Sequence, residues 1–185
     1  MRPVAALKYD ETVQSSAQPF AEILIFELDQ QRYGLATADV LEIVRAVKIT
    51  PLPKAPAIVE GVINVRGAVL AVLDIRQRFR HGPRLPRLED HFLITRVGVR
   101  SVVLRVDRVL SLSHIRHSDI EDAKAVVPFS DYVAGVAKLP DGIVLIHDPQ
   151  TFLSQGESAH LSLALSLTSS LASSLASGQS DGSAR

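Results

Sequence analysis

Short apolar runs separated by turn residues recur from about residue 20 to about residue 150. Runs of four to eight residues that are rich in Val, Ile and Leu are typical of β-strands. Between residues 99 and 112 the apolar positions alternate with Arg100, Arg105 and Arg108, which is the pattern of half-buried strands. The pattern predicts an all-β fold of about ten strands in two groups of five, with runs at residues 23–28, 33–36, 62–65, 68–75, 91–97, 99–112, 132–139 and 143–148.

Two hairpin turns are evident among these runs. Asp141-Gly142 separates the last two, and an Asp-Gly pair favours a tight two-residue turn. Arg66-Gly67 joins two runs, 62–65 and 68–75, that are apolar on both faces. Strands of this kind need cover on each side, so we expect a closed barrel or a second layer over this hairpin.

Short helices are expected where a polar cap precedes spaced apolar residues. Thr37 is placed to cap a helix that carries Val40, Leu41 and Val44 at helical spacing. Asp148-Pro149 has the sequence of a helix start, because proline suits the first helical position. Single helical turns are predicted at residues 57–60 and 118–121, and a closing helix over about residues 148–155.

The intervening segments suggest where the chain divides. Residues 1–19 mix small and polar residues and predict a flexible leader. The sequence TPLPKAP, residues 50–56, holds three prolines and is expected to be an extended connector. The polar, Pro-rich segment at residues 80–90 predicts a boundary between a first barrel, about 20–80, and a second, about 90–148.

The end of the chain has a different composition. Residues 156–185 are rich in Ser, Leu and Ala and carry few charges or caps, so we expect a disordered tail. The alternative is a weak amphipathic helix, because Leu167, Leu171 and Leu175 fall on one helical face.

Composition and charge exclude several classes of function. Lys and Arg number 20, and so do Asp and Glu, so no net charge attracts the protein to nucleic acid or to an anionic membrane. A small-barrel nucleic-acid-binding protein is the alternative of another class, but it would need a basic face with stacking aromatics. Cysteine is absent, which excludes disulfides and zinc–thiolate sites.

The sequence predicts a cytoplasmic protein with no direct membrane insertion. Lys8, Asp10 and Glu11 stand where a signal peptide would be apolar. The longest uncharged stretch, residues 159–180, contains eight serines and is too polar to span a bilayer.

Candidate chemistry is sparse, and we expect no enzymatic activity, no cofactor and no metal. The phosphate-binding patterns G-x-x-x-x-G-K-[ST] and G-x-G-x-x-G are both missing. His114 and His117, with Asp119 and Glu121, form the best metal candidate, but histidines three apart in a polar connector are more often solvated.

Asp74 and Asp107 each follow an apolar run. They could form a pair of carboxylates, but acceptance of hydrogen bonds from nearby turn backbone is the favoured interpretation. Arg66, at a hairpin tip, offers five donors and a permanent charge. Two interpretations of Arg66 remain open: it recognises a carboxylate, or it is simply solvated.

The order of short motifs resembles the CheW family of chemotaxis coupling proteins over about residues 20–155. No single motif is specific, but six occur in order at compatible spacing. They are F-E-L-x-x-x-x-Y-G-L from residue 26, V-L-E-I from 40, T-x-L-P-x-x-P from 50, G-V-I-N-V-R-G from 61, L-D-I-R from 73 and V-x-R-V-D-R-V from 103.

The resemblance implies two five-stranded SH3-like β-barrels, with short helices, and a non-catalytic adaptor in chemotaxis signal transduction. Its implied partners are the regulatory domain of a CheA-type histidine kinase and the cytoplasmic tip of a methyl-accepting chemoreceptor, which would place the protein at membrane receptor arrays. A chemosensory pathway for pili or surface sensing is the alternative. The partner-binding positions that the resemblance implies are Val40, Glu42, Gly61, Asn64, Arg66 and Gly67. Glu42 and Arg66 are also expected to lie near each other, because both flank the Pro-rich connector.

Overall fold

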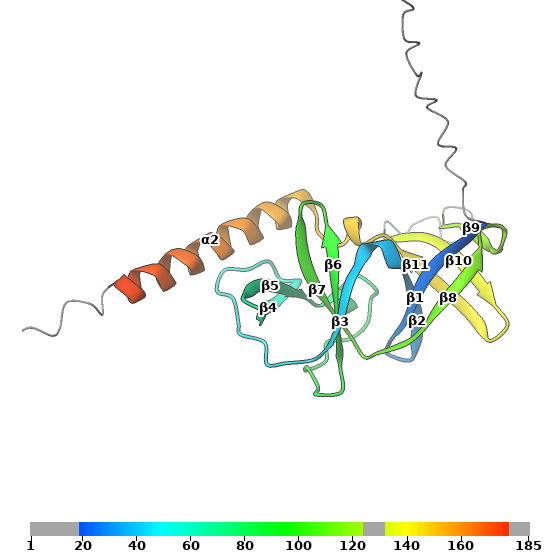
Figure 1. Ribbon diagram of the computed structural model, residues 1–185, viewed down its shortest axis with the longest axis horizontal. Coiled ribbons are helices and arrows are strands. Elements are labelled where there is room, and N and C mark those ends of the chain that lie inside the picture. Colours follow the sequence, from blue (N-terminus) through cyan, green and yellow to red (C-terminus); the bar gives the residue numbers. More distant parts are fainter. Residues whose placement is uncertain (1–18, 124–131, 178–185) are drawn as a thin grey trace, which may run out of the picture.

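The computed structural model describes residues 19–123 and 132–177, which form two β-sheets and one long helix (Figure 1). Short 3-10 turns, η1 to η4, join several strands. The strands are β1 (Phe20–Leu28), β2 (Gln31–Ala36), β3 (Val40–Arg45), β4 (Val59–Val65), β5 (Ala68–Leu73), β6 (His91–Val97), β7 (Arg100–Val106), β8 (Arg108–Arg116), β9 (Ile120–Asp122), β10 (Val133–Leu139) and β11 (Gly142–His147).

The first sheet has six strands in the order β8-β1-β2-β11-β10-β9. All neighbours are antiparallel except β11 and β2, which run parallel. The sheet curls around its own apolar interior, formed by buried side chains from β1, β8, β10 and β11. These are Ile23, Ile25, Ile115, Ala137, Val144 and Ile146.

The second sheet has five strands in the order β3-β6-β7-β5-β4, with β5 and β7 parallel. Its separate interior consists of Ile63, Val72, Phe92, Ile94 and Val103. Because each strand alternates between this interior and the opposite face, the other half of its apolar residues is free to pack elsewhere.

A third, larger core lies between the two barrels. Side chains of the first sheet, including Phe26 and Leu35, pack there with Leu73 and Leu104 of the second. The ring of Tyr33 stacks on that of Phe79 with centroids 4.4 Å apart. This shared core explains why both hairpin strands at residues 62–73 are apolar on two faces.

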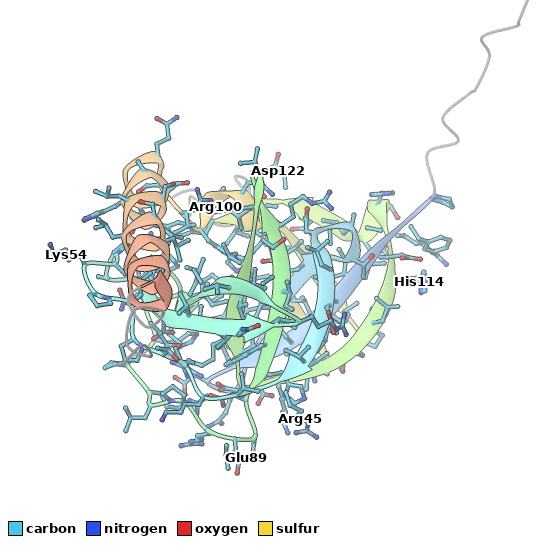
Figure 2. The ribbon with its side chains drawn as sticks, turned by 60° about the vertical axis from the view of Figure 1, so that its left-hand side comes forward. Arg45, Lys54, Glu89, Arg100, His114 and Asp122 are labelled. Atoms are coloured by element: carbon cyan, nitrogen blue, oxygen red, sulfur yellow. The ribbon has the colours of Figure 1, made fainter. Side chains whose placement is uncertain are left out.

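The predicted all-β class and the two SH3-like barrels are confirmed, but the predicted boundary is wrong. The eleven described strands divide into six and five, and β1 and β2 pair with strands from the C-terminal half. The segment at residues 80–90 does not separate the barrels: it is a loop that leaves β5 and returns to β6 in the same sheet. Glu89 marks its outer end in Figure 2.

Residues 37–44 are not a helix. A 3-10 turn, η1 (Thr37–Asp39), leads directly into β3. The β-branched residues of this segment favour a strand, and β3 pairs with β6 while Val44 packs in the second barrel. Leu41 and Ile43 then point away from Val44, because side chains alternate along a strand.

The other predicted turns are partly correct. Residues 57–58 form a turn, but β4 begins at Val59. The turn predicted at residues 118–121 is displaced, since η3 (His117–Asp119) precedes β9. The predicted closing helix is the single turn η4 (Pro149–Thr151), in which Asp148 caps the backbone N–H of Gln150 at 2.9 Å.

The C-terminal segment corrects the expectation of a disordered tail. The first turn of helix α2 (Gln155–Ser177) contains Glu157, whose carboxylate accepts bonds from Ser154 and, at 2.5 Å, from Arg78. Leu161 and Ala164 are buried in the shared core, so tertiary packing orders a sequence with little helical signal of its own. Beyond these contacts α2 extends away from the barrels (Figure 1).

Some expectations lie outside the described residues. These include the leader up to residue 18, the side chains of Leu171 and Leu175, and the last eight residues, 178–185. Within the described part of the chain, no helix combines the length and hydropathy needed to cross a membrane.

Candidate functional site

The tip of the β4–β5 hairpin is a two-residue turn formed by Arg66 and Gly67. Val65 pairs with Ala68, and both turn residues have positive φ, 50° and 87°. Two consecutive positive φ values identify a type I′ turn, whose twist matches that of the flanking strands. The Oδ1 atom of Asn64 accepts a hydrogen bond from the Gly67 N–H at 2.9 Å. A residue of the G-V-I-N-V-R-G motif therefore stabilises the turn that the same motif forms.

Arg66 donates from Nη2 to Oε1 of Glu42 at 2.7 Å. The guanidinium side chain is 79% exposed and the carboxylate side chain 31% exposed. Since β3 and β4 are the two outer strands of the five-stranded sheet, this ion pair connects its edges. The predicted proximity of Glu42 and Arg66 is therefore confirmed.

Exposed apolar side chains also lie on β3 and on the β4–β5 hairpin. Leu41 and Ile43 on β3 are 46% and 43% exposed, and Val69 on β5 is 57% exposed. Leu41 and Ile43 lie on the opposite side of β3 from Glu42, because side chains alternate along a strand. We call the exposed ion pair of Glu42 and Arg66 the Glu42–Arg66 face. The exposure of the three apolar residues was missed from the sequence, although alternation along residues 40–45 would have revealed two of them once that segment was assigned as a strand.

Two predicted site residues lie deeper. Val40 is half-buried and packs against the shared core. Gly61 is buried, and a Cβ atom there would overlap the backbone oxygen of Thr50. Glycine therefore permits Thr50 and Val62 to exchange backbone hydrogen bonds at 2.9 and 2.8 Å. Gly61 therefore allows the close backbone contact between β4 and the Pro-rich connector, and it is not part of an exposed surface.

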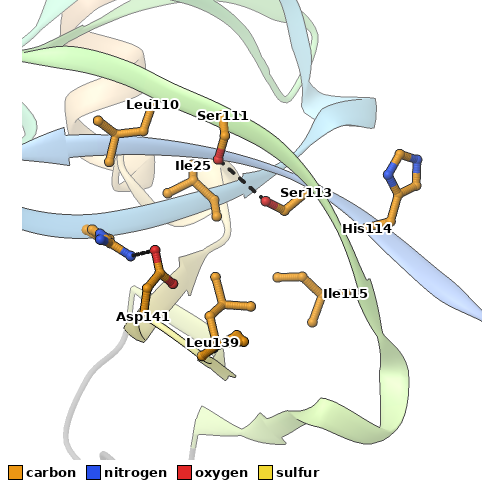
Figure 3. Close-up of a pocket in the computed structure, with 10 residues that line it drawn as sticks. Ile25, Leu110, Ser111, Ser113, His114, Ile115, Leu139 and Asp141 are labelled. Carbon is orange, nitrogen blue, oxygen red and sulfur yellow. Dashed lines mark hydrogen bonds and ion pairs between the residues drawn. The ribbon is translucent and has the colours of Figure 1, made fainter.

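A groove of about 500 Å³ lies between β8 and the β10–β11 turn (Figure 3). Its walls combine apolar side chains with two serine hydroxyls, and an ion pair of 2.6 Å between Arg32 and Asp141 lies on its rim. The lining residues are Ile25, Arg32, Leu110, Ser111, Ser113, His114, Ile115, Leu139, Pro140 and Asp141.

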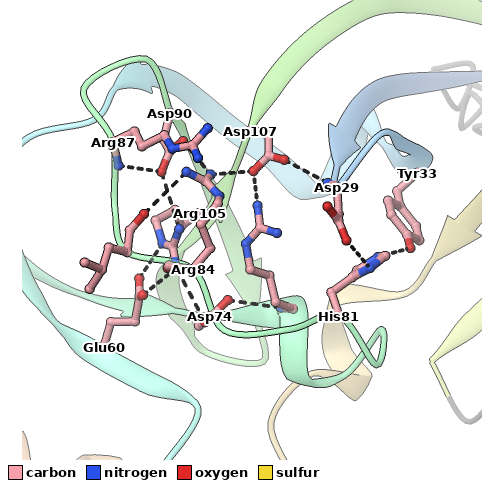
Figure 4. Close-up of polar contacts among 12 residues, drawn as sticks. Asp29, Tyr33, Glu60, Asp74, His81, Arg84, Arg87, Asp90, Arg105 and Asp107 are labelled. Carbon is pink, nitrogen blue, oxygen red and sulfur yellow. Dashed lines mark hydrogen bonds and ion pairs between the residues drawn. The ribbon is translucent and has the colours of Figure 1, made fainter.

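A buried ionic network lies beneath the surface, centred on Arg105 (Figure 4). This fully buried guanidinium binds both oxygens of Glu60, at 2.7 and 2.6 Å. It also lies 3.4 Å from carboxylate oxygens of Asp74 and Asp90. Parallel two-point bonds of this kind fix a side chain in one orientation.

Asp107 extends the network between the barrels. It accepts the backbone N–H of Asp29, in the β1–β2 turn, at 2.8 Å, and it binds Arg76 and Arg84. Burial raises the pKa of the Asp107 carboxyl, but the Asp29 N–H and the two arginines outweigh burial and hold the pKa below its usual value.

The preferred interpretation of Asp74 and Asp107 is confirmed, since each accepts a backbone N–H. For Asp74 the donor is Arg76, at 3.1 Å. Both carboxylates also face arginines. Asp107, from the V-x-R-V-D-R-V motif, and Arg76, from the L-D-I-R motif, together link the β1–β2 turn of the first barrel to the second barrel.

His114 and His147 lie in different environments. His114 pairs across the sheet with Glu22 at 3.1 Å. Within the described residues no group of three His, Asp or Glu side chains is placed to hold a metal ion. His147 is buried beside Tyr33 and Phe79, and burial lowers its pKa to about 4.

The family model for the CheW-like domain matches residues 22–157. The chain belongs to that family. The CheW-like domain thus spans both barrels and ends in the first turn of α2, which leaves most of that helix outside the matched region.

Individual relatives support the same assignment. The chemotaxis protein CheW of Treponema pallidum is 24% identical over 147 residues, covering 76% of this chain and 86% of the relative. Protein FrzA of Myxococcus xanthus is 35% identical over 113 residues, covering 60% and 69%. The crystal structure of the scaffolding protein TtCheW from Thermoanaerobacter tengcongensis superposes with a TM-score of 0.68 at 30% identity, covering 75% of this chain and 95% of that one.

Proposed function

We propose that this CheW-family protein is a non-catalytic adaptor that couples chemoreceptors to a CheA-type histidine kinase. The observation that carries the proposal is the Glu42–Arg66 face, an exposed ion pair on elements that also carry the exposed apolar residues Leu41, Ile43 and Val69. Exposed charges and exposed apolar groups on neighbouring elements suit partner binding, since the charges select a partner and the apolar groups supply affinity.

The geometry of the face suits reversible binding. Arg66 sits on a rigid type I′ turn, so little conformational entropy is lost when a partner carboxylate binds it. An exposed ion pair contributes only about 0 to 1 kcal/mol to folding, so a partner can rearrange it without unfolding the barrel. Val40, Gly61, Asn64 and Gly67 then support the face from behind.

The partners follow from the family. We assign one contact to the regulatory domain of the kinase and another to the cytoplasmic tip of a receptor. The protein would then lie in the cytoplasm and be held at membrane arrays through these partners, without inserting into the bilayer itself. The alternative is a scaffold of a chemosensory pathway for pili or surface sensing, and the similarity to protein FrzA is consistent with it.

Absence of catalysis is also supported by the polar network. Each of its carboxylates, Glu60, Asp74, Asp90 and Asp107, faces an arginine. A carboxylate held in an ion pair is a poor general base, because its oxygens are already engaged by the guanidinium. The balanced charge argues further against a nucleic-acid-binding role.

The test is co-sedimentation of the protein with receptor-containing membranes and a CheA-type kinase. Arg66→Glu should weaken binding about tenfold or more, because it opposes a partner carboxylate and repels Glu42. Arg108→Glu is the matched control, since Arg108 is 61% exposed and pairs with Glu27 at 2.9 Å on another surface. Circular dichroism checks that both variants are folded.

The outcomes separate the parts of the proposal. Unchanged binding by folded Arg66→Glu would reject the Glu42–Arg66 face. A wild-type protein that bound neither partner would reject the adaptor role, and salt-dependent binding of RNA in its place would favour the nucleic-acid alternative.

A further inference from the structure

The six-stranded sheet has two free edges, β8 and β9, among the described strands. β9 is three residues long and pairs only with residues 135–137 of β10. The last two residues of β10, Lys138 and Leu139, therefore have no described strand on their outer side. The outer side of β8 is likewise unpaired, since β1 is its one neighbour in the described sheet. An opening remains between these two edges.

The groove beside β8 occupies this opening. Its lining comes from both edges, since Ser111, Ser113 and Ile115 belong to β8 and Leu139 ends β10 (Figure 3). We call it the β8 groove. Its volume of about 500 Å³ lies within the range of about 300 to 1,000 Å³ that binding clefts occupy. The groove thus has the position of a strand that the sheet lacks.

The edge of β8 lacks two features that usually block strand pairing. Residues 109–115, VLSLSHI, contain no proline and no Lys, Arg, Asp or Glu, although proteins commonly protect a free edge with such residues. The bulge in the β1–β8 ladder lies at Ile25/Phe26, so residues 111–116 form a regular edge. Unpaired backbone N–H and C=O groups along a regular edge can bind an extended peptide as an added strand.

The lining also suits an extended peptide. Ser111 pairs with Ile25, whose side chain faces the barrel interior, and Ser113 lies on the same side of β8. Their hydroxyl oxygens are 3.5 Å apart and can bond to polar groups of a peptide. Apolar walls formed by Ile25, Ile115 and Leu139 would contact the side chains at alternate positions of the same peptide.

Charge indicates what else the peptide should carry. Arg116, next to Ile115 at the end of the groove, is exposed, and within residues 19–123 and 132–177 it forms no ion pair. Arg32 on the rim, by contrast, already pairs with Asp141 at 2.6 Å. An unpaired guanidinium at one end of the groove favours a carboxylate on the segment that docks there.

We propose that the β8 groove binds an extended segment of a partner protein as an added β-strand, with apolar side chains at alternate positions and an acidic residue beside Arg116. A second copy of this protein is disfavoured as the occupant, because its strands are attached to a barrel and the β10–β11 turn lies across the groove. The groove belongs to the six-stranded sheet, whereas Glu42 and Arg66 belong to the five-stranded sheet. The added strand is therefore a contact separate from the Glu42–Arg66 face.

The probe is a fluorescein-labelled peptide with blocked ends, Glu-Val-Thr-Val-Thr-Val-Thr-Glu, whose two glutamates allow either strand direction. Fluorescence anisotropy should show saturable binding with a Kd between about 10 µM and about 1 mM.

Two N-methylated versions of the peptide test the mode of binding. One is methylated on every valine nitrogen and the other on every threonine nitrogen. Successive N–H groups of a strand point to opposite neighbours, so only one of these sets faces β8. On the other side, β10 offers only Lys138 and Leu139. One methylated peptide should therefore bind about tenfold or more weakly than the other.

Two protein variants test the site. Arg116→Glu should weaken binding of the glutamate peptide about three- to tenfold, and a peptide with lysine in place of both glutamates should recover affinity for this variant. Its matched control is Arg45→Glu, at an exposed arginine on β3. Ser111→Arg fills the groove and should weaken binding of both peptides, whereas Ser118→Arg, at an exposed serine outside the groove, should not. Circular dichroism checks that all four variants are folded.

Four results would overturn the proposal. The first is no binding of the peptide up to about 1 mM. The second is equal binding of the two N-methylated peptides, which would mean that the peptide backbone does not pair with β8. The third is unchanged affinity in folded Ser111→Arg or Arg116→Glu, which would place the peptide elsewhere. The fourth is self-association in sedimentation velocity that Ser111→Arg abolishes, without peptide binding, which would make a second copy the occupant.

Discussion

Arg105 binds Glu60 through two parallel hydrogen bonds of 2.7 and 2.6 Å, and the arginine side chain has no exposure to solvent. The pair joins β7 to β4, strands that are not neighbours in the sheet. Removing the guanidinium would leave Glu60 without its counter-charge and would also remove the 3.4 Å contacts of Arg105 with Asp74 and Asp90.

Arg105→Ala should therefore destabilise the protein by about 3 to 5 kcal/mol, the usual cost of breaking a buried ion pair from one side. Denaturant unfolding at neutral pH measures this difference. The control is Arg66→Ala, which breaks an exposed Arg–Glu pair and should cost no more than about 1 kcal/mol. Similar losses in the two variants would mean that burial of Arg105 does not determine its contribution.

His147 should make stability depend on pH between about 6.5 and 4. Burial lowers its folded-state pKa to about 4, whereas the unfolded value is 6.5. Below pH 6.5 the unfolded chain takes up a proton that the folded protein does not, so the free energy of unfolding falls as pH falls towards 4. The full effect is about 3 kcal/mol.

Urea unfolding at pH 7 and at pH 4.5 tests this dependence. The difference between the two should shrink in His147→Phe, which keeps an aromatic ring beside Tyr33 and Phe79 but cannot titrate. His114→Phe is the control, because its ring is exposed. If His147→Phe showed the same pH dependence as the wild type, another group would have to be responsible.

Truncation should distinguish the docked part of α2 from its extension. Ending the chain after Ser154 removes the buried Leu161 and Ala164 and the Glu157–Arg78 pair, so the free energy of unfolding should fall by about 2 to 4 kcal/mol. Ending it after Leu167 keeps these contacts and should change stability little. Thermal melting of both truncated chains provides the comparison, and equal melting temperatures would contradict the docking of α2.

Gly61→Ala should destabilise the hairpin by about 1 to 3 kcal/mol, because the new Cβ would overlap the Thr50 backbone and force the connector away from β4. Partner binding should weaken in parallel, since the hairpin carries Arg66. Gly82→Ala is the matched control, because nothing lies within 4 Å of its Cβ position. Normal stability in Gly61→Ala would show that the connector adjusts freely.

Local patterns predicted much of this fold. The Arg66-Gly67 turn lies where the sequence places it, because a tight turn is determined by the residues that form it. The other hairpin turn is displaced by one residue: Pro140 and Asp141 form it, and Gly142 is already the first residue of β11. The proximity of Glu42 and Arg66 was predictable because both flank the Pro-rich connector. The segment at 37–44 misled because its apolar spacing suits a helix, whereas pairing with β6 and burial of Val44 select a strand.

Features that depend on contacts between distant parts of the chain could not be predicted from local sequence patterns. The pairing of β1 with β8 joins residues about 90 positions apart, and no local pattern specifies such a partner. The order of α2 depends on a surface for Leu161 that only the folded barrels supply.

The interleaving of the two sheets has a consequence for synthesis. All five strands of the second sheet lie between Val40 and Val106, so they are available together once that stretch has left the ribosome. The first sheet is completed later, because β2 lacks its partner β11 until His147 has left the ribosome. Until β8 emerges to pair with β1, β1 and β2 are thus an isolated hairpin, an element of marginal stability in water, attached to a barrel that is already complete.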